Sequence, residues 1–128
     1  MPEAIPERVR RFVEANINSV EQLEVLLLLR QELNKSWTAE AVSQALYTPR
    51  SAAAMRLADL VHRQIAVVDE SQINFRFQPA NSELQPIVDE LAAVYRERRV
   101  AVISLIYSKP NDHVKAFADA FRLRKDKG

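Results

Sequence analysis

Few residues in this chain have the types and the spacing that catalysis or metal binding requires. Asp59 and His62 lie three residues apart, so one helical face could present two metal ligands. A metal site normally has three or four ligands, and the same pair is also typical of a solvated helix surface. The chain has no cysteine, and its single glycine is Gly128, so thiolate chemistry and a glycine-rich phosphate loop are both excluded. We therefore predict no enzymatic activity, no cofactor and no metal site.

Two short helices with a sharp corner between them have the clearest start signals in the sequence. Thr38 is a good N-cap for a helix that runs to about Leu46, because its hydroxyl can accept a bond from a free backbone N–H. A second start signal follows at once, with Thr48 as N-cap and Pro49 at the first helical position. Only Tyr47 and Thr48 separate the two helices, which predicts a tight turn.

Two short strands follow the second helix. Residues 65–68 are apolar, residues 69–72 form a polar turn, and residues 73–77 alternate apolar with polar side chains, as a half-buried strand does. Over about residues 20–80 the chain resembles the winged helix-turn-helix transcriptional regulators of bacteria. The stretch 60–68 is similar to the usual exit of their second helix into the wing. The resemblance implies a mainly α fold with a small β-hairpin.

The resemblance also implies that the helix over residues 49–63 enters the major groove of duplex DNA. Arg50 or Arg56 could donate two bonds to a guanine, Ser51 could hold a phosphate, and Met55 could contact a thymine methyl group. The candidate DNA-binding residues are Thr48, Arg50, Ser51, Met55, Arg56 and Arg76.

The charge of this region keeps a second function open. Affinity for duplex DNA comes mostly from Lys and Arg against phosphates, yet residues 36–82 contain four basic and four acidic residues. The expected wing tip carries Asp69 and Glu70 rather than basic side chains. One hypothesis is therefore a DNA-binding regulator, and the other is a winged helix that binds another protein through its alanine-rich helix and Met55.

Helices are expected on both sides of this motif. Pro6 begins a first helix, and Ser19 caps a second one that is apolar nearly all round and belongs in the middle of the fold. After the hairpin, one long helix is predicted from Glu83 to about Ser108, and a final short helix from Asp112. We expect a winged-helix domain over 1–80 and a helical extension over 81–128.

The long helix has a heptad-like apolar seam, which predicts a homodimer surface within residues 83–121. The alternative is that these helices fold back onto the core of the same chain. The candidate dimerisation residues are Leu91, Tyr95, Val102, Leu105, Ile106, Phe117 and Phe121.

Composition favours a folded protein of the cytoplasm. The 128 residues are 48% hydrophobic and 27% charged, which suits a single hydrophobic core. The start has prolines and glutamates where a secretory signal has an apolar segment, and the apolar run 25–29 is too short to span a bilayer.

Residues 92–128 contain nine basic and four acidic residues, compatible with an arm on nucleic acid or with a solvated helix end.

Overall fold

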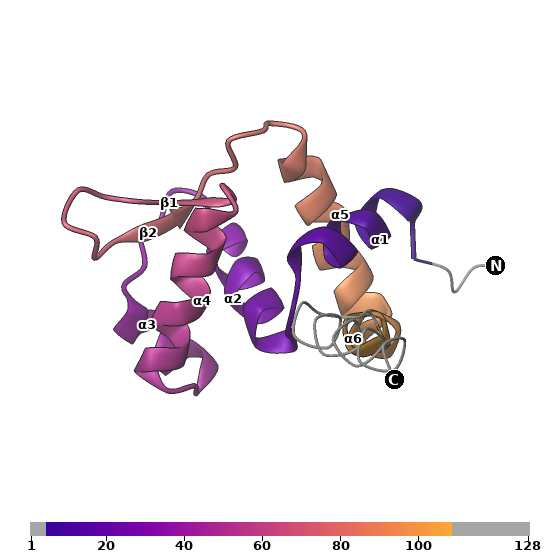
Figure 1. The fold of residues 1–128 in the computed structure, drawn as a ribbon, viewed down its shortest axis with the longest axis horizontal. Coiled ribbons are helices and arrows are strands. Elements are labelled where there is room, and N and C mark those ends of the chain that lie inside the picture. The colour runs from indigo at the N-terminus through magenta and orange to yellow at the C-terminus, as the bar shows by residue number, and fades with distance from the viewer. Residues whose placement is uncertain (1–4, 109–128) are drawn as a thin grey trace, which may run out of the picture.

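A computed structural model describes residues 5–108, in which six helices and one two-stranded antiparallel sheet follow in the order shown in Figure 1. The elements are α1 (Glu7–Asn16), α2 (Val20–Gln31), α3 (Ala39–Leu46), α4 (Arg50–His62), β1 (Ala66–Val68), β2 (Phe75–Phe77), α5 (Leu84–Glu97) and α6 (Arg99–Ser108). The helix predicted from Asp112, with Phe117 and Phe121, lies outside the described residues. Among the helices described, none has the length and apolar character needed to cross a bilayer.

The corner between α3 and α4 forms as the cap signals predict, with one shift. Thr38 Oγ1 accepts a bond of 3.0 Å from the backbone N–H of Ala41 and caps α3. Tyr47 then adopts a left-handed conformation, with φ of 55°, which ends α3 and turns the chain. Thr48 is not the cap of α4: Pro49 occupies that position and the helix begins at Arg50. The Thr48 hydroxyl donates to the carboxylate of Glu21 instead.

The hairpin pairs β1 with β2 in antiparallel register, with Ala66 opposite Phe77 and Val68 opposite Phe75. Trp37 forms an isolated antiparallel bridge with Phe75 of β2. The two backbones exchange hydrogen bonds of 2.7 and 2.8 Å. Gln64, just before β1, has a φ of 64°. The predicted fold class, a mainly α winged helix-turn-helix with a small hairpin, is confirmed.

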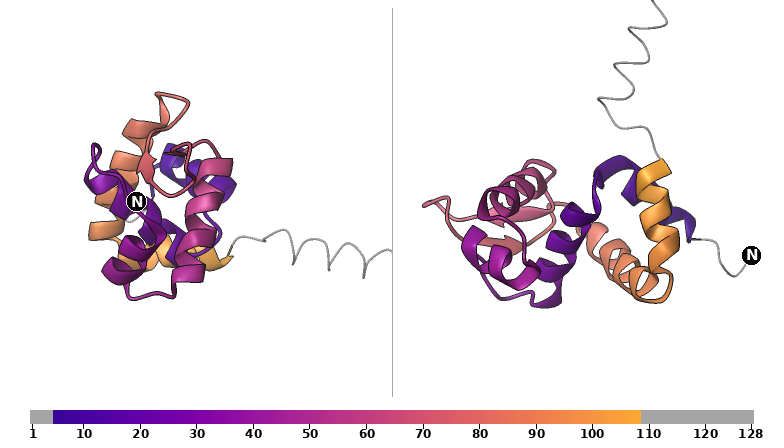
Figure 2. Two further views of the ribbon diagram at one scale, coloured as in Figure 1. Left: turned by 90° about the vertical axis from the view of Figure 1, so that its left-hand side faces the viewer. Right: turned by 90° about the horizontal axis from the view of Figure 1, so that it is seen from below.

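Helix α2 lies in the middle of the fold and separates two groups of elements. On one side are α3, α4 and the hairpin, which we call the winged half; on the other are α1, α5 and α6, which we call the flanking half (Figures 1 and 2). Helix α2 is buried at Leu23, Val25, Leu26 and Leu29, so it contributes to the core on both sides. Its central position agrees with its nearly all-round apolar sequence.

The single long helix predicted over residues 83–108 is wrong, because the chain breaks at Arg98. Arg98 has φ of −133° and ψ of 52°, outside the helical region, and it separates α5 from α6. The break turns α6 back across α1 and α5, where Val102 and Ile106 are buried. The gain from burying this apolar helix outweighs the few backbone bonds lost at the break.

The predicted domain boundary near residue 80 stays a prediction. Helix α1, which was assigned to the first domain, packs against α5 and α6. Its buried side chains are Val9, Phe12 and Val13. Ile17, which follows the helix, is also buried.

Candidate nucleic-acid interface

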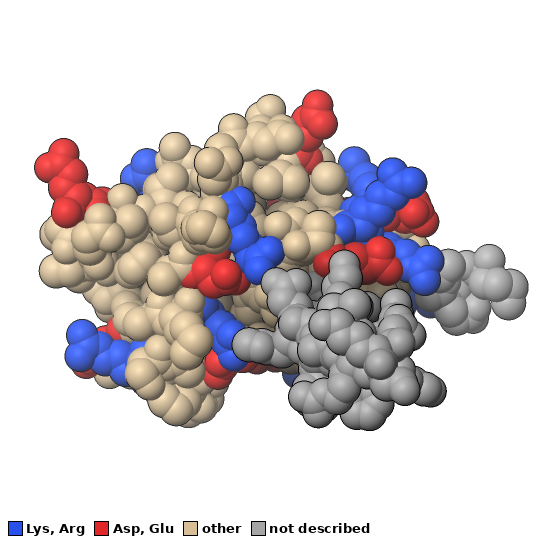
Figure 3. Space-filling view, viewed as in Figure 1, with Lys and Arg blue, Asp and Glu red and all other residues tan. Residues whose placement is uncertain are grey.

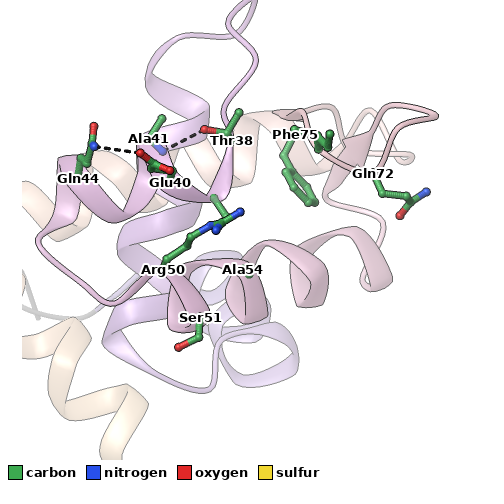
Figure 4. A pocket seen from close by; sticks show the side chains of 11 residues that line it. Thr38, Glu40, Ala41, Gln44, Arg50, Ser51, Ala54, Gln72 and Phe75 are labelled. Carbon is green, nitrogen blue, oxygen red and sulfur yellow. Dashed lines mark hydrogen bonds between the residues drawn. The ribbon is translucent and has the colours of Figure 1, made fainter.

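An open cleft of about 750 Å³ lies between α3, the first two turns of α4 and the hairpin (Figure 4). Its walls are formed by six polar or charged residues and five apolar ones. The lining residues are Thr38, Ala39, Glu40, Ala41, Gln44, Arg50, Ser51, Ala54, Gln72, Ile73 and Phe75. The cleft therefore combines the start of the predicted reading helix, α4, with the wing.

Arg50 is the cation of this cleft. Its side chain is exposed and extends from α4 toward α3 and Phe75 (Figure 4). No carboxylate among the described residues pairs with it: Glu40, the acid of the cleft, accepts a long bond of 3.5 Å from Gln44. An exposed guanidinium without an ion-pair partner can donate to a phosphate or to a base edge.

The exposed side of α4 is otherwise small and apolar. Ser51 and Ala54 line the cleft, and Met55 next to them is 62% exposed. The opposite side of the helix carries Ala53, Leu57 and Leu60, which are fully buried, as the periodicity predicts. Among the predicted DNA-binding residues on α4, Arg50, Ser51 and Met55 are thus open to a partner.

Thr48 and Arg56 are directed toward α2 instead. Glu21, in the first turn of α2, accepts a hydrogen bond from the Thr48 hydroxyl at Oε2 and one of 2.9 Å from Arg56 Nε at Oε1. The side chains of Arg56 and Glu21 are only 30% and 31% exposed. The Thr48 hydroxyl, followed by the Arg56 guanidinium, lowers the pKa of the Glu21 carboxyl below its ordinary value of 4.5.

Arg76 lies on the other face of the hairpin from the cleft. Successive side chains of a strand alternate in direction, so Phe75 faces the cleft and Arg76 does not. Arg76 is exposed and donates to Gln78 through Nε at 3.2 Å and Nη2 at 2.7 Å. The structure therefore does not bring Arg76 and Arg50 together in one cleft.

The wing tip is acidic, but one of its acids is engaged in folding the turn. Asp69 accepts hydrogen bonds from the Ser71 hydroxyl, the Ile73 backbone, and both the backbone and the side chain of Asn74. The Asn74 amide, followed by the Ser71 hydroxyl, holds the pKa of Asp69 well below its ordinary value of 3.8. Figure 3 shows acidic side chains at the far end of the hairpin and interleaved charges over the rest of that face.

Glu21 and Gln22 were not identified from sequence as partners of α4. Gln22 is 1% exposed, and its Nε2 donates to Asn16 O and to Asp59 Oδ2, both at 2.8 Å. Asp59 also pairs with Arg63 at 3.0 Å, so its partners are not those of a metal ligand. Within residues 5–108 no group of three or more acidic or histidine side chains could hold a metal ion. Gln22 and Asp59 are 37 residues apart, and no local signal in the sequence connects them.

The predicted dimerisation residues lie mostly inside the chain. Leu91 and Val102 are fully buried, Ile106 and Tyr95 are 4% and 9% exposed, and Leu105 is half-buried. These side chains therefore form the core of the flanking half, as the alternative of helices folding back onto the same chain requires. Whether two chains associate is not tested by this placement, and the dimer stays a prediction.

No protein-family model matches the sequence, and no curated protein matches it either. The comparison with solved structures does find similar folds. The Staphylococcus aureus MepR F27L mutant, bound to an oligodeoxyribonucleotide, matches with a TM-score of 0.51 and 13% identity, over 94% of this chain and 86% of that one. Bordetella bronchiseptica BpsR, studied for regulation of its DNA binding by 6-hydroxynicotinic acid, matches with a TM-score of 0.51 and 15% identity, over the same shares.

A MarR family protein from Bacillus stearothermophilus is a further match, with a TM-score of 0.48, 16% identity and coverage of 94% of this chain and 82% of that one. At identities this low, the two matches above 0.5 show that the architecture is shared and nothing more. Within residues 5–108 the chain has a winged helix-turn-helix fold, which it shares with MepR and BpsR.

Proposed function

We propose that this protein is a DNA-binding transcriptional regulator of the cytoplasm that places the first two turns of α4 in the major groove. The observation that carries the proposal is Arg50: an exposed arginine, without an ion-pair partner in residues 5–108, at the start of α4 and in the cleft beside the wing. Ser51 adds a hydroxyl for a phosphate, and Met55 adds an apolar surface for a thymine methyl group.

The pairing of charges indicates which arginines are available to DNA. Arg56 and Arg63 are neutralised by Glu21 and Asp59, whereas Arg50 and Arg76 have no carboxylate partner among the described residues. With two such arginines the electrostatic part of binding is modest. Each phosphate contact contributes about −0.9 to the slope of log affinity against log salt, so we expect about −2 per chain. A much steeper slope would indicate further phosphate contacts by basic residues outside the winged half, such as Arg96.

We further propose that the regulator is a homodimer whose two α4 helices enter neighbouring turns of the major groove, about 34 Å apart. Outside the corner at Tyr47, the described large apolar side chains with the highest exposure are on α6, where Val100 and Tyr107 are 77% and 76% exposed. Sedimentation equilibrium would test this directly. Replacing both side chains with serine should yield a monomer if α6 forms the interface.

A protein-binding function is the second candidate, and the exposed apolar side chains favour it. Met55 and Ile73 are 62% and 55% exposed on the two sides of the cleft, and the winged half has no excess of positive charge. An apolar partner would bind here with little dependence on salt. The two candidates are therefore separated by the response of duplex binding to salt.

The test measures binding of labelled random-sequence duplex while the salt is raised from about 50 to 200 mM. Arg50→Ala should weaken binding about tenfold at low salt and reduce the slope by about one contact. Arg96→Ala is the matched control, because Arg96 is also an exposed arginine without an ion-pair partner in the described part, but lies on α5. Equal losses in both variants would contradict a specific role for α4. Absence of duplex binding at low salt would favour the protein-binding function.

A further inference from the structure

Glu21 joins the turn that precedes α4 to the second turn of that helix, and these two points lie on either side of the exposed segment of α4. Thr48 precedes Arg50 by two residues, and Arg56 follows Met55 directly, so the two donors to Glu21 bracket residues 50–55. Each donor bonds a different oxygen of the same carboxylate. One side chain of α2 thereby restrains both the start of α4 and its second turn.

We propose that Glu21 is a positioning residue for the reading helix, fixing the direction in which Arg50 and Ser51 project toward DNA. The inference rests on the proposed function of α4. Holding a helix both at its second turn and at the turn that leads into it restricts its rotation about its own axis, and that rotation decides which side chains face the groove. A contact to a base edge depends on hydrogen-bond geometry, so a small rotation of α4 weakens sequence preference before it weakens general attraction to phosphates.

The same contact assigns Arg56 to structure and not to DNA. Its guanidinium is half-buried and donates to Glu21 at 2.9 Å, whereas Arg50 is exposed and unpaired within the described chain. If Arg56 bound a DNA phosphate instead, the carboxylate of Glu21 would lose its charged partner. Arg56 therefore supports the pose of α4, and its loss should resemble the loss of Glu21.

A separate contact allows the proposal to be tested without unfolding the protein. Gln22, the next residue of α2, bonds Asp59 on the following turn of α4 at 2.8 Å. This bond, with the buried Leu57 and Leu60, remains when Glu21 is changed. Glu21→Gln offers the matched control, because its amide oxygen can accept from Arg56 while its amide nitrogen donates to the Thr48 hydroxyl.

The experiment compares binding to random duplex with binding to duplexes enriched from a random pool by the unaltered protein. Glu21→Ala and Arg56→Ala should each reduce the preference for enriched duplex about tenfold, as expected when one well-aligned base contact is lost. The double variant should lose no more than either single variant. Glu21→Gln should keep the preference. The salt slope should stay unchanged in Arg56→Ala but become shallower by about one contact in Arg50→Ala.

Two results would overturn the proposal. If Arg56→Ala reduces the salt slope as much as Arg50→Ala does, Arg56 contacts a phosphate directly. If Glu21→Ala strengthens binding to all duplexes equally and leaves the preference intact, Glu21 acts only through its charge.

A third measurement does not depend on DNA. Glu21→Ala should speed amide hydrogen exchange in residues 50–55 relative to α6, while Glu21→Gln should not. Unchanged exchange in Glu21→Ala would reject the positioning role. If the unaltered protein binds no duplex at all, the proposed function fails, and this exchange measurement alone decides whether Glu21 positions α4.

Discussion

The winged half and the flanking half are attached to α2 in different ways. On the winged side the side chains of the Arg56–Glu21 pair are 30% and 31% exposed, and the buried amide of Gln22 donates to Asp59 of α4. On the flanking side, the side chains of the pairs Arg30–Asp89 and Arg99–Glu24 are between 32% and 62% exposed, and buried apolar side chains make the rest of the contact. Exposed ion pairs contribute little, whereas partly buried hydrogen-bonded ones restrict geometry.

Backbone strain follows the same division. Among residues 5–108 the three residues with positive φ, namely Tyr47, Gln64 and Gln72, are all in the winged half. None is a glycine, and side chains with a Cβ atom cost free energy in this region. The comparison teaches that one half of the protein is built for a defined surface geometry, while the other is built for burial of apolar area.

The largest expected change in the free energy of unfolding tests the apolar core of the flanking half. Leu91→Ala should lower the free energy of unfolding by about 3 kcal/mol, because Leu91 is fully buried and the substitution leaves a cavity. Leu57→Ala is the matched change in the winged half, with the same zero exposure. Denaturation in urea measures both. A loss below about 1 kcal/mol for Leu91→Ala, beside about 3 kcal/mol for Leu57→Ala, would contradict a well-packed core in the flanking half.

The next effect tests the polar attachment of the winged half. Gln22→Leu should cost about 2 kcal/mol, because Asn16 O and the Asn18 N–H would each lose their hydrogen-bond partner next to the core. Its counterpart in the flanking half is Tyr95→Phe, which removes one bond of 3.2 Å to Glu24 and should cost below about 1 kcal/mol. Thermal unfolding measures both losses of stability. Equal losses in the two variants would contradict a difference between the contacts of α2 with the winged half and with the flanking half.

A smaller effect, in this case a gain in stability, tests the backbone strain at Tyr47. Tyr47 is 96% exposed and has a φ of 55°, so its side chain contributes no packing while its backbone is unfavourable. Tyr47→Gly should therefore stabilise the fold by up to about 1 kcal/mol. Tyr47→Ala keeps the Cβ atom and serves as control, and urea denaturation should show no gain for it. Destabilisation by glycine would mean that the corner is not strained.

The smallest effect concerns pH. Because the pKa of Glu21 is lowered on folding, its charge stabilises the folded state above the unfolded value of about 4.5, and this contribution is lost as the pH falls through the folded pKa. The stability difference between the unaltered protein and Glu21→Gln should thus be constant from neutral pH to about 4.5 and shrink below it. Urea denaturation of both proteins across this range measures the difference in free energy of unfolding. A difference that stays constant down to the lowest pH would contradict the stabilising role of the Glu21 charge.

The sequence predicts most of the winged half because its signals are local. Thr38 and Ser19 cap their helices through their own hydroxyls, and the apolar face of α4 is read from spacing alone. The break at Arg98 carries no glycine or proline to mark it. Packing of α6 against α1 decides it, and such tertiary contacts override local preference.

The candidate interface was only partly predictable for the same reason. Arg50 and Arg56 are equivalent by residue type and lie on one helix, yet one is open and the other is bound by Glu21. Glu21 and Arg56 are 35 residues apart, and no sequence pattern connects them. Ser51 and Met55, predicted as DNA contacts from their place on the second helix of the motif, are both exposed, and their role stays a prediction.

The fold-back of α6 also bears on how the protein is made. Helix α1 leaves the ribosome before the other described helices, but the surfaces it packs on belong to α5 and α6, which leave last. Helices α2 to α4 and the hairpin can associate while the rest of the chain is still being synthesised. The apolar side of α1 therefore stays exposed to water, or bound by chaperones, until translation has passed Ile106.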